Sequence, residues 1–103
     1  MRITGGIHCG RKLKVPSTGV VRPTQDRVRE ALFSMLAAGF PGWRVLDLFA
    51  GSGAVGFDAL SRGAAGVVWV ERDRRACAVL EENRAALAAA AGRVVCADAR
   101  RWV

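Results

Sequence analysis

Apolar residues along the chain follow two kinds of pattern. Short runs rich in apolar residues at 45–49, 67–70 and 93–97 have the length of strands covered on both faces of a parallel sheet. Apolar residues recurring every three to four positions predict helices over 54–62 and 74–90. The chain therefore predicts an α/β fold, a β-α-β-α-β unit whose right-handed crossovers place the parallel strands in the order 3-2-1.

The first forty residues carry weaker versions of the same signals. Residues 12–15 alternate polar and apolar, and a glycine pair upstream can make a tight turn, so we predict a small N-terminal β-hairpin. A further apolar stripe predicts a helix that begins at Thr24 and ends near residue 39. These signals divide the chain into a basic hairpin and loop, 1–21, and an α/β domain, 22–103.

The segment that joins the first strand to the next helix carries the most specific motif. Gly51, Gly53 and Gly56 match the G-x-G-x-x-G fingerprint, in which glycines allow a tight turn and close approach of the backbone to a ligand. Glu71 lies twenty residues after Gly51, where an acid that binds a ribose is expected. The fingerprint indicates a cofactor that contains a nucleoside.

Asp47 narrows the choice of cofactor. Its carboxylate, four residues before the first glycine, would repel a pyrophosphate but attract the ammonium and sulfonium groups of S-adenosylmethionine. If Asp47 only caps the turn, a nicotinamide-dependent oxidoreductase remains the alternative. Asp47, Glu71 and Asp98 each end a predicted strand, and the carboxyl ends of parallel strands form the ligand-binding edge of an open sheet.

Charge and cysteine content indicate the partner and the compartment. The net charge is +7, and residues 1–25 contain five basic side chains and no acid. Such a segment favours a polyanion, most plausibly nucleic acid, although a solvated basic face is an equal alternative. Three widely spaced cysteines without a C-x-x-C motif favour a reducing cytoplasm and predict no metal site. No apolar run is long enough for a membrane span.

Several segments together resemble a known family. Residues 47–53, Asp-Leu-Phe-Ala-Gly-Ser-Gly, are similar to the first motif of class I S-adenosylmethionine-dependent methyltransferases. Residues 22–30, with the motifs at 2–6 and 10–13, resemble the bacterial 16S ribosomal RNA guanine-N2 methyltransferase family. The resemblance covers essentially the whole chain. It implies a Rossmann-like fold and methyl transfer from S-adenosylmethionine to the exocyclic N2 amine of a guanine in 16S rRNA.

The resemblance also implies roles for individual residues. Asp47 would lie near the cofactor ammonium, Glu71 would accept hydrogen bonds from the ribose, and Asp98 would accept one from the adenine amino group. The other implied cofactor-binding residues are Phe49, Ala50, Gly51, Ser52, Gly53, Arg72, Ala99, Thr24 and Arg27. RNA phosphates would be bound by Arg2, Arg11, Lys12, Lys14 and Arg22. The partner would be ribosomal RNA or the small ribosomal subunit, and the full-length enzyme a monomer.

One family motif is missing from the sequence. The catalytic Asp/Asn-Pro-Pro-Tyr/Phe motif that follows the fourth strand in the family has no counterpart, because no two prolines here are adjacent. We therefore expect a partial fold, the N-terminal half of a methyltransferase domain, in which the first strand is an exposed edge. No catalytic residue is predicted in this chain. A non-catalytic RNA-binding fragment is the remaining alternative.

Overall fold

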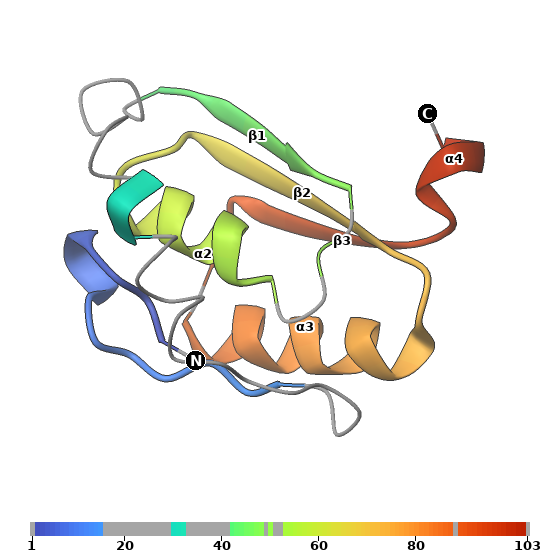
Figure 1. The fold of residues 1–103 in the computed structure, drawn as a ribbon, viewed down its shortest axis with the longest axis horizontal. Helices are drawn as coiled ribbons and strands as arrows, with labels where there is room; N and C mark the ends of the chain where they lie inside the picture. The colour runs from blue at the N-terminus through green and yellow to red at the C-terminus, as the bar shows by residue number, and fades with distance from the viewer. Residues whose placement is uncertain are drawn as a thin grey trace.

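The computed structural model describes residues 2–15, 30–32, 42–48, 50, 53–87 and 89–102. These residues form a three-stranded parallel sheet, with the two longer helices lying against one of its faces (Figure 1). The short last helix lies beyond the carboxyl ends of the strands. The predicted α/β class and parallel sheet are confirmed.

The strands are β1 (Arg44–Asp47), β2 (Gly66–Glu71) and β3 (Gly92–Cys96), and β2 lies between the other two. This is the predicted strand order, with each strand within one to two residues of its expected bounds. β1 pairs only with β2 among the described residues, so it forms one edge of the sheet. Leu46, in the middle of β1, is 49% exposed, as expected for an edge strand.

The helices connect the strands in the expected order. α2 (Ala54–Ser61) joins β1 to β2, α3 (Arg74–Ala86) joins β2 to β3, and α4 (Ala99–Trp102) follows β3. Asp73 caps α3 as its side chain accepts a hydrogen bond from the Arg75 N–H at 2.9 Å. α3 ends four residues before the predicted Ala90, since the chain must turn there to enter β3. Of the helix predicted from Thr24, only residues 30–32 are described, and they are helical.

Trp69 occupies the centre of the core between the sheet and α2. Its side chain is fully buried, and its ring centroid lies 4.4 Å from that of Phe57 on α2. A Cβ placed on Gly56 would collide with the Trp69 indole and the Val67 side chain. The third glycine of the fingerprint therefore allows the close packing of helix on strand that the sequence predicted.

The N-terminal segment forms two antiparallel arms, as predicted, but they are not joined by a tight glycine turn. The two arms meet at a single antiparallel bridge, between Arg2 and Lys12, and the 3-10 helix η1 (Gly6–His8) lies between them. The arms are too far apart in sequence for a tight glycine turn, and η1 packs against α2 instead. Ile3 and Leu13, each next to a bridge residue, are buried in the core. The segment is thus held by tertiary packing more than by strand pairing.

Candidate functional site

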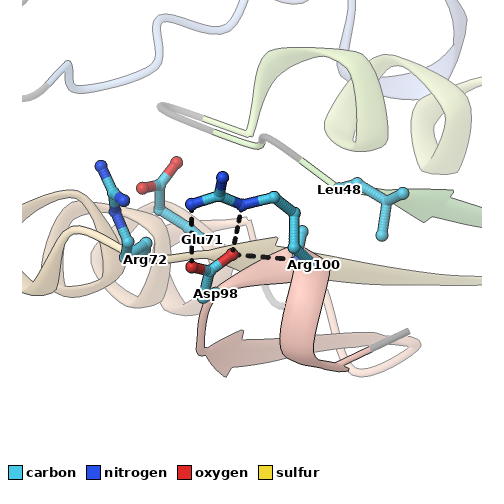
Figure 2. A pocket seen from close by; sticks show the side chains of 6 residues that line it. Leu48, Glu71, Arg72, Asp98 and Arg100 are labelled. Carbon is cyan, nitrogen blue, oxygen red and sulfur yellow. Dashed lines mark hydrogen bonds and ion pairs between the residues drawn. The ribbon is translucent and has the colours of Figure 1, made fainter.

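A cavity of about 370 Å³ opens at the carboxyl ends of β2 and β3. Glu71 is the last residue of β2, and Asp98 follows β3 by two residues. Both line the cavity, together with Leu48, Arg72, Ala99 and Arg100 (Figure 2). The structure therefore brings together four residues predicted from sequence to bind the cofactor: Glu71, Arg72, Asp98 and Ala99.

Asp98, which immediately precedes the short helix α4, is held by Arg100 of that helix. Its Oδ1 accepts hydrogen bonds from the Arg100 main-chain N–H at 3.0 Å and from Nε at 3.4 Å, and its Oδ2 lies 3.3 Å from Nη2. The guanidinium hydrogen bond lowers the pKa of Asp98 below its ordinary value of 3.8. Asp98 is therefore a charged acceptor at neutral pH. The Arg100 side chain is 77% exposed, so it can turn away from Asp98 without disturbing the core.

Glu71 is fixed from two directions. Its main-chain carbonyl accepts the Ala97 N–H at 2.9 Å, and its Oε2 accepts the Asp73 N–H at 2.8 Å. In Figure 2 the Arg100 side chain extends over Asp98 toward Glu71. Two carboxylates and an exposed guanidinium thus face one cavity, which suits a ligand with several hydrogen-bond donors.

The glycine turn is supported from below by Trp69, a residue that the sequence reasoning missed. The indole Nε1–H donates to the Gly53 carbonyl at 3.1 Å, and the Gly53 N–H donates to the Ala50 carbonyl at 2.8 Å. Gly53 has φ +83°, a left-handed conformation that favours glycine. Because a buried tryptophan needs an acceptor for its N–H, a tryptophan in a strand predicted to be buried was the sequence signal for such a contact.

Asp47 lies at the carboxyl end of β1, in register with Trp69, and it is half-buried. The next residue, Leu48, reaches the cavity. Asp47 and Glu71 therefore end adjacent strands at the same edge, as predicted. The remaining predicted site residues lie outside the described part of the chain: Thr24, Arg27, Phe49, Gly51, Ser52 and, for RNA, Arg22.

The other predicted RNA-binding residues form an exposed basic face on the N-terminal segment. Arg2 and Lys12 are opposite each other at the bridge, so their side chains share one face. Arg11 Nη2 donates to the Ala86 carbonyl at 3.1 Å, and Lys14 Nζ lies 3.1 Å from Glu82. Such an exposed pair is weak and can be exchanged for a phosphate.

Metal binding and membrane insertion find no support in the described residues. No cluster of three or more His, Cys, Asp or Glu side chains is placed there to hold a metal ion. No described helix has the length and apolar character needed to cross a membrane. The three cysteines are free, and burial raises the pKa of Cys77 to about 12, so its thiol is unreactive at neutral pH.

The chain matches a family model and several known proteins, and these matches agree with one another. A family model described as "Conserved hypothetical protein 95" matches residues 1–102. The ribosomal RNA small subunit methyltransferase D of Escherichia coli is 50% identical over 103 residues, which make up 100% of this chain and 52% of that protein. The chain thus spans about half the length of the curated relatives that it matches.

Solved structures extend this result to the fold. An Escherichia coli protein, provisionally named methyltransferase yhhF, matches with a TM-score of 0.89 and 49% identity, over 99% of this chain and 56% of that one. A SAM-dependent methyltransferase from Agrobacterium tumefaciens matches with a TM-score of 0.66 and 26% identity, over 80% of this chain and 26% of that one. These matches confirm the resemblance to ribosomal RNA methyltransferases that the sequence indicated.

Proposed function

Because the chain belongs to the family described as Conserved hypothetical protein 95, we propose that it forms the S-adenosylmethionine-binding part of a ribosomal RNA methyltransferase. The full enzyme would transfer a methyl group to the N2 amine of a guanine in 16S rRNA, in the cytoplasm, as a monomer. The names of the relatives support an rRNA substrate and a methyl donor of this kind.

The observation that carries the proposal is the pair of acids at neighbouring strand ends, Glu71 and Asp98, lining one cavity. An adenosine group presents two ribose hydroxyls and an adenine amino group, all of which can donate hydrogen bonds. Glu71 would accept from the hydroxyls, and the charged Asp98 from the amino group. Arg72 and Ala99 would flank the adenine ring, since both line the same cavity.

The position of Asp47 supports a methyl donor over a nicotinamide nucleotide. Both cofactors contain adenosine, so Glu71 and Asp98 alone do not distinguish them. Asp47 ends the strand next to Glu71, on the side where the rest of the cofactor would extend toward the glycine turn. A carboxylate there would stabilise an ammonium and destabilise a pyrophosphate. The glycine turn, with Phe49, Ala50, Gly51, Ser52 and Gly53, would pass beneath the methionine part, near Thr24 and Arg27.

When bound, S-adenosylmethionine would supply an electrophilic methyl group to the guanine N2; the S–CH3 bond would break to leave S-adenosylhomocysteine, and the methylated amine would lose a proton to water. The residues of this chain would bind and orient, and we assign none of them a proton transfer. Catalysis by positioning alone can be large, because it removes the entropy cost of bringing two reactants together. The basic residues Arg2, Arg11, Lys12, Lys14 and Arg22 would hold the RNA by its phosphates without reading its sequence.

A three-ligand titration of the purified chain by calorimetry tests the proposal. S-adenosylmethionine should bind, S-adenosylhomocysteine should bind more weakly because it lacks the sulfonium charge, and NADH should not bind. Replacing Asp47 by Asn should weaken S-adenosylmethionine and S-adenosylhomocysteine alike, because both carry the ammonium that Asp47 would stabilise. Glu81→Gln removes an exposed carboxylate from α3 that pairs with Arg84, so it serves as the control and should change nothing.

Two results would overturn the assignment. Tight binding of NADH with no binding of S-adenosylmethionine would favour the oxidoreductase. Salt-sensitive RNA binding with no binding of either cofactor would favour a non-catalytic RNA-binding fragment.

A further inference from the structure

Three buried polar side chains join the basic N-terminal segment to the helices. They are Asp58 and Ser61 on α2 and Asn83 on α3, exposed by 0%, 3% and 3%. We call these three residues the docking seam. Each forms hydrogen bonds with main-chain atoms of the N-terminal segment, more than fifty residues away in sequence.

The α2 part of the seam holds the beginning of the segment. Asp58 Oδ1 accepts the Thr4 N–H at 2.6 Å and the Thr4 hydroxyl at 3.0 Å. One turn further along α2, the Ser61 hydroxyl donates to the Gly5 carbonyl at 2.5 Å and accepts the His8 N–H at 2.9 Å. These hydrogen bonds fix where residues 4–8 lie along α2 and how they are oriented on it.

Asn83 pairs with the main-chain N–H and carbonyl of Lys14, as a residue of a neighbouring strand would. Its Oδ1 accepts the Lys14 N–H at 2.9 Å, and its Nδ2 donates to the Lys14 carbonyl at 3.0 Å. An amide is required for this pair of bonds, because aspartate has no donor and alanine has neither group. Asn83 therefore specifies which residue of the arm lies opposite this point of α3.

The docking seam sets the direction in which residues 11–14 run along α3. Arg11 reaches the carbonyl of Ala86 at the end of α3, and Lys14 lies one turn earlier, beside Asn83. The arm thus runs against α3, toward the helix end that follows Glu71 and the cavity, as Figure 1 also shows. Lys12 and Lys14 follow Arg11 along this arm, in the direction of the cavity.

Stability alone does not explain three polar groups in this position. Buried polar side chains gain little over well-packed apolar ones of similar size, because their desolvation offsets their hydrogen bonds. They do impose a unique geometry, since a shift of the arm by one residue would break these hydrogen bonds. The composition of the seam therefore favours a role in positioning.

We propose that the docking seam, with Asn83 as its main member, positions Lys12 and Lys14 so that they hold RNA phosphates at a fixed distance from the cofactor cavity. This inference rests on the proposed function, because it takes RNA as the ligand of the basic face. Asn83 is a positioning residue, which acts through Lys12 and Lys14 and does not itself touch the RNA.

Fluorescence anisotropy with a labelled 20-nucleotide RNA stem–loop tests the inference on the purified chain. Asn83→Ala should weaken binding roughly tenfold and lower the slope of log Kd against log salt by about 1 to 2, as Lys12 and Lys14 lose their phosphates. S-adenosylmethionine affinity should stay within about twofold, since alanine is a good helix former and the cavity lies at the other end of α3.

Glu82→Ala is the matched control. Glu82 is the neighbour of Asn83 and contacts Lys14 only through the side chain, so the main-chain bonds of the seam remain. This variant should bind RNA as well as the parent chain or more tightly, because the Lys14 charge is released. Equal weakening by Glu82→Ala and Asn83→Ala would overturn the inference.

A double-mutant cycle separates positioning from a general loss of structure. Lys12→Ala should weaken RNA binding in the parent chain and have little further effect in an Asn83→Ala background. Full additivity of the two changes would overturn the inference. If Asn83→Ala does not fold, as judged by circular dichroism, the same cycle is run with Asn83→Asp, which keeps the acceptor for the Lys14 N–H.

The outcomes also separate this inference from the proposed function. If the parent chain binds S-adenosylmethionine but not the RNA, the RNA part of the proposed function fails. If the parent chain binds RNA and Asn83→Ala leaves its affinity and salt slope unchanged, only the inference about the seam fails.

Discussion

The docking seam and the cavity at the strand ends each contain a carboxylate, but the two carboxylates are held by different kinds of partner. Asp58 in the seam is fully buried and binds Thr4, 54 residues away in sequence. Asp98 in the cavity is 22% exposed and binds Arg100, which is only two residues away in sequence. The first arrangement fixes two distant segments to each other. In the second arrangement, Asp98 has an exposed partner, Arg100, which a ligand can replace.

This difference teaches how to separate structural polar residues from binding residues within one small domain. A group that is buried and satisfied by distant main-chain atoms cannot change partners without local unfolding. A group at the mouth of a cavity, satisfied by a flexible neighbour, can exchange that neighbour for a ligand at low cost. Four changes, given from the largest expected effect to the smallest, would break or sharpen the comparison.

Removing the seam carboxylate should have the largest effect. Asp58→Ala leaves the N–H and hydroxyl of Thr4 without this acceptor in a buried site, so the free energy of unfolding should fall by about 3 kcal/mol. Urea titration followed by circular dichroism measures the loss. Glu81→Ala, which removes an exposed carboxylate, should change stability by no more than about 0.5 kcal/mol. A loss for Asp58→Ala below that of the control would show that the seam is not a fixed contact.

Removing a cavity carboxylate should affect binding more than stability. Glu71→Gln keeps the size of the side chain but turns a charged acceptor into a neutral amide. S-adenosylmethionine affinity should fall roughly 10- to 50-fold, the usual cost of losing charged hydrogen bonds. Calorimetry measures the affinity, and a urea titration should show a nearly unchanged midpoint. A large loss of stability with no loss of affinity would place Glu71 with the seam residues instead.

Removing Arg100, the partner of Asp98, should strengthen the binding of S-adenosylmethionine. Arg100→Ala releases Asp98 from the guanidinium, so the adenine amino group need not displace it. We expect S-adenosylmethionine to bind about two- to threefold more tightly, since an exposed ion pair of this kind is weak. The same calorimetric titration measures this gain. A clear loss of affinity would mean that Arg100 contacts the cofactor directly, and the cavity would then have fewer exchangeable groups than proposed.

The smallest effect should appear in the dependence of stability on pH. The folded state lowers the pKa of Asp98, so its contribution to stability is present above pH 3.8 and is lost as the pH falls through the lowered pKa. Asp98→Asn should therefore melt slightly below the parent chain at pH 7, and the difference should shrink on acidification below pH 3.8. Thermal melts at pH 7, 4 and 3 check this, and a difference that grows on acidification would contradict it.

The sequence predicted the sheet and part of the site for clear physical reasons. Apolar runs of strand length and helical stripes between them are local signals, and right-handed crossovers then leave one strand order. Glu71 and Asp98 could be found because each follows a predicted strand, and parallel strands end at one edge. The position of Asn83 on the apolar stripe of α3 also predicted a hydrogen-bond partner for it, since a polar residue there must find one when buried, and the partner is the main chain of Lys14.

The features that sequence reasoning missed depend on partners far away along the chain. Asp58 lies within an apolar stretch of α2, but nothing near it indicates Thr4 as its partner. The N-terminal segment was predicted as a hairpin with a tight turn because its local pattern alternates, whereas the structure places η1 between the two arms, which are bridged at Arg2 and Lys12. Local patterns indicate elements, and the contacts between distant segments require the fold itself.

The hydrogen bond from Trp69 to the glycine turn has a practical consequence for spectroscopy. The indole is enclosed by the core and donates to the Gly53 carbonyl, so its emission is sensitive to any displacement of that turn. Trp43, by contrast, is 48% exposed and emits from a largely aqueous environment. Trp69 is therefore an intrinsic fluorescent probe of any displacement of Gly53, and it needs no added dye.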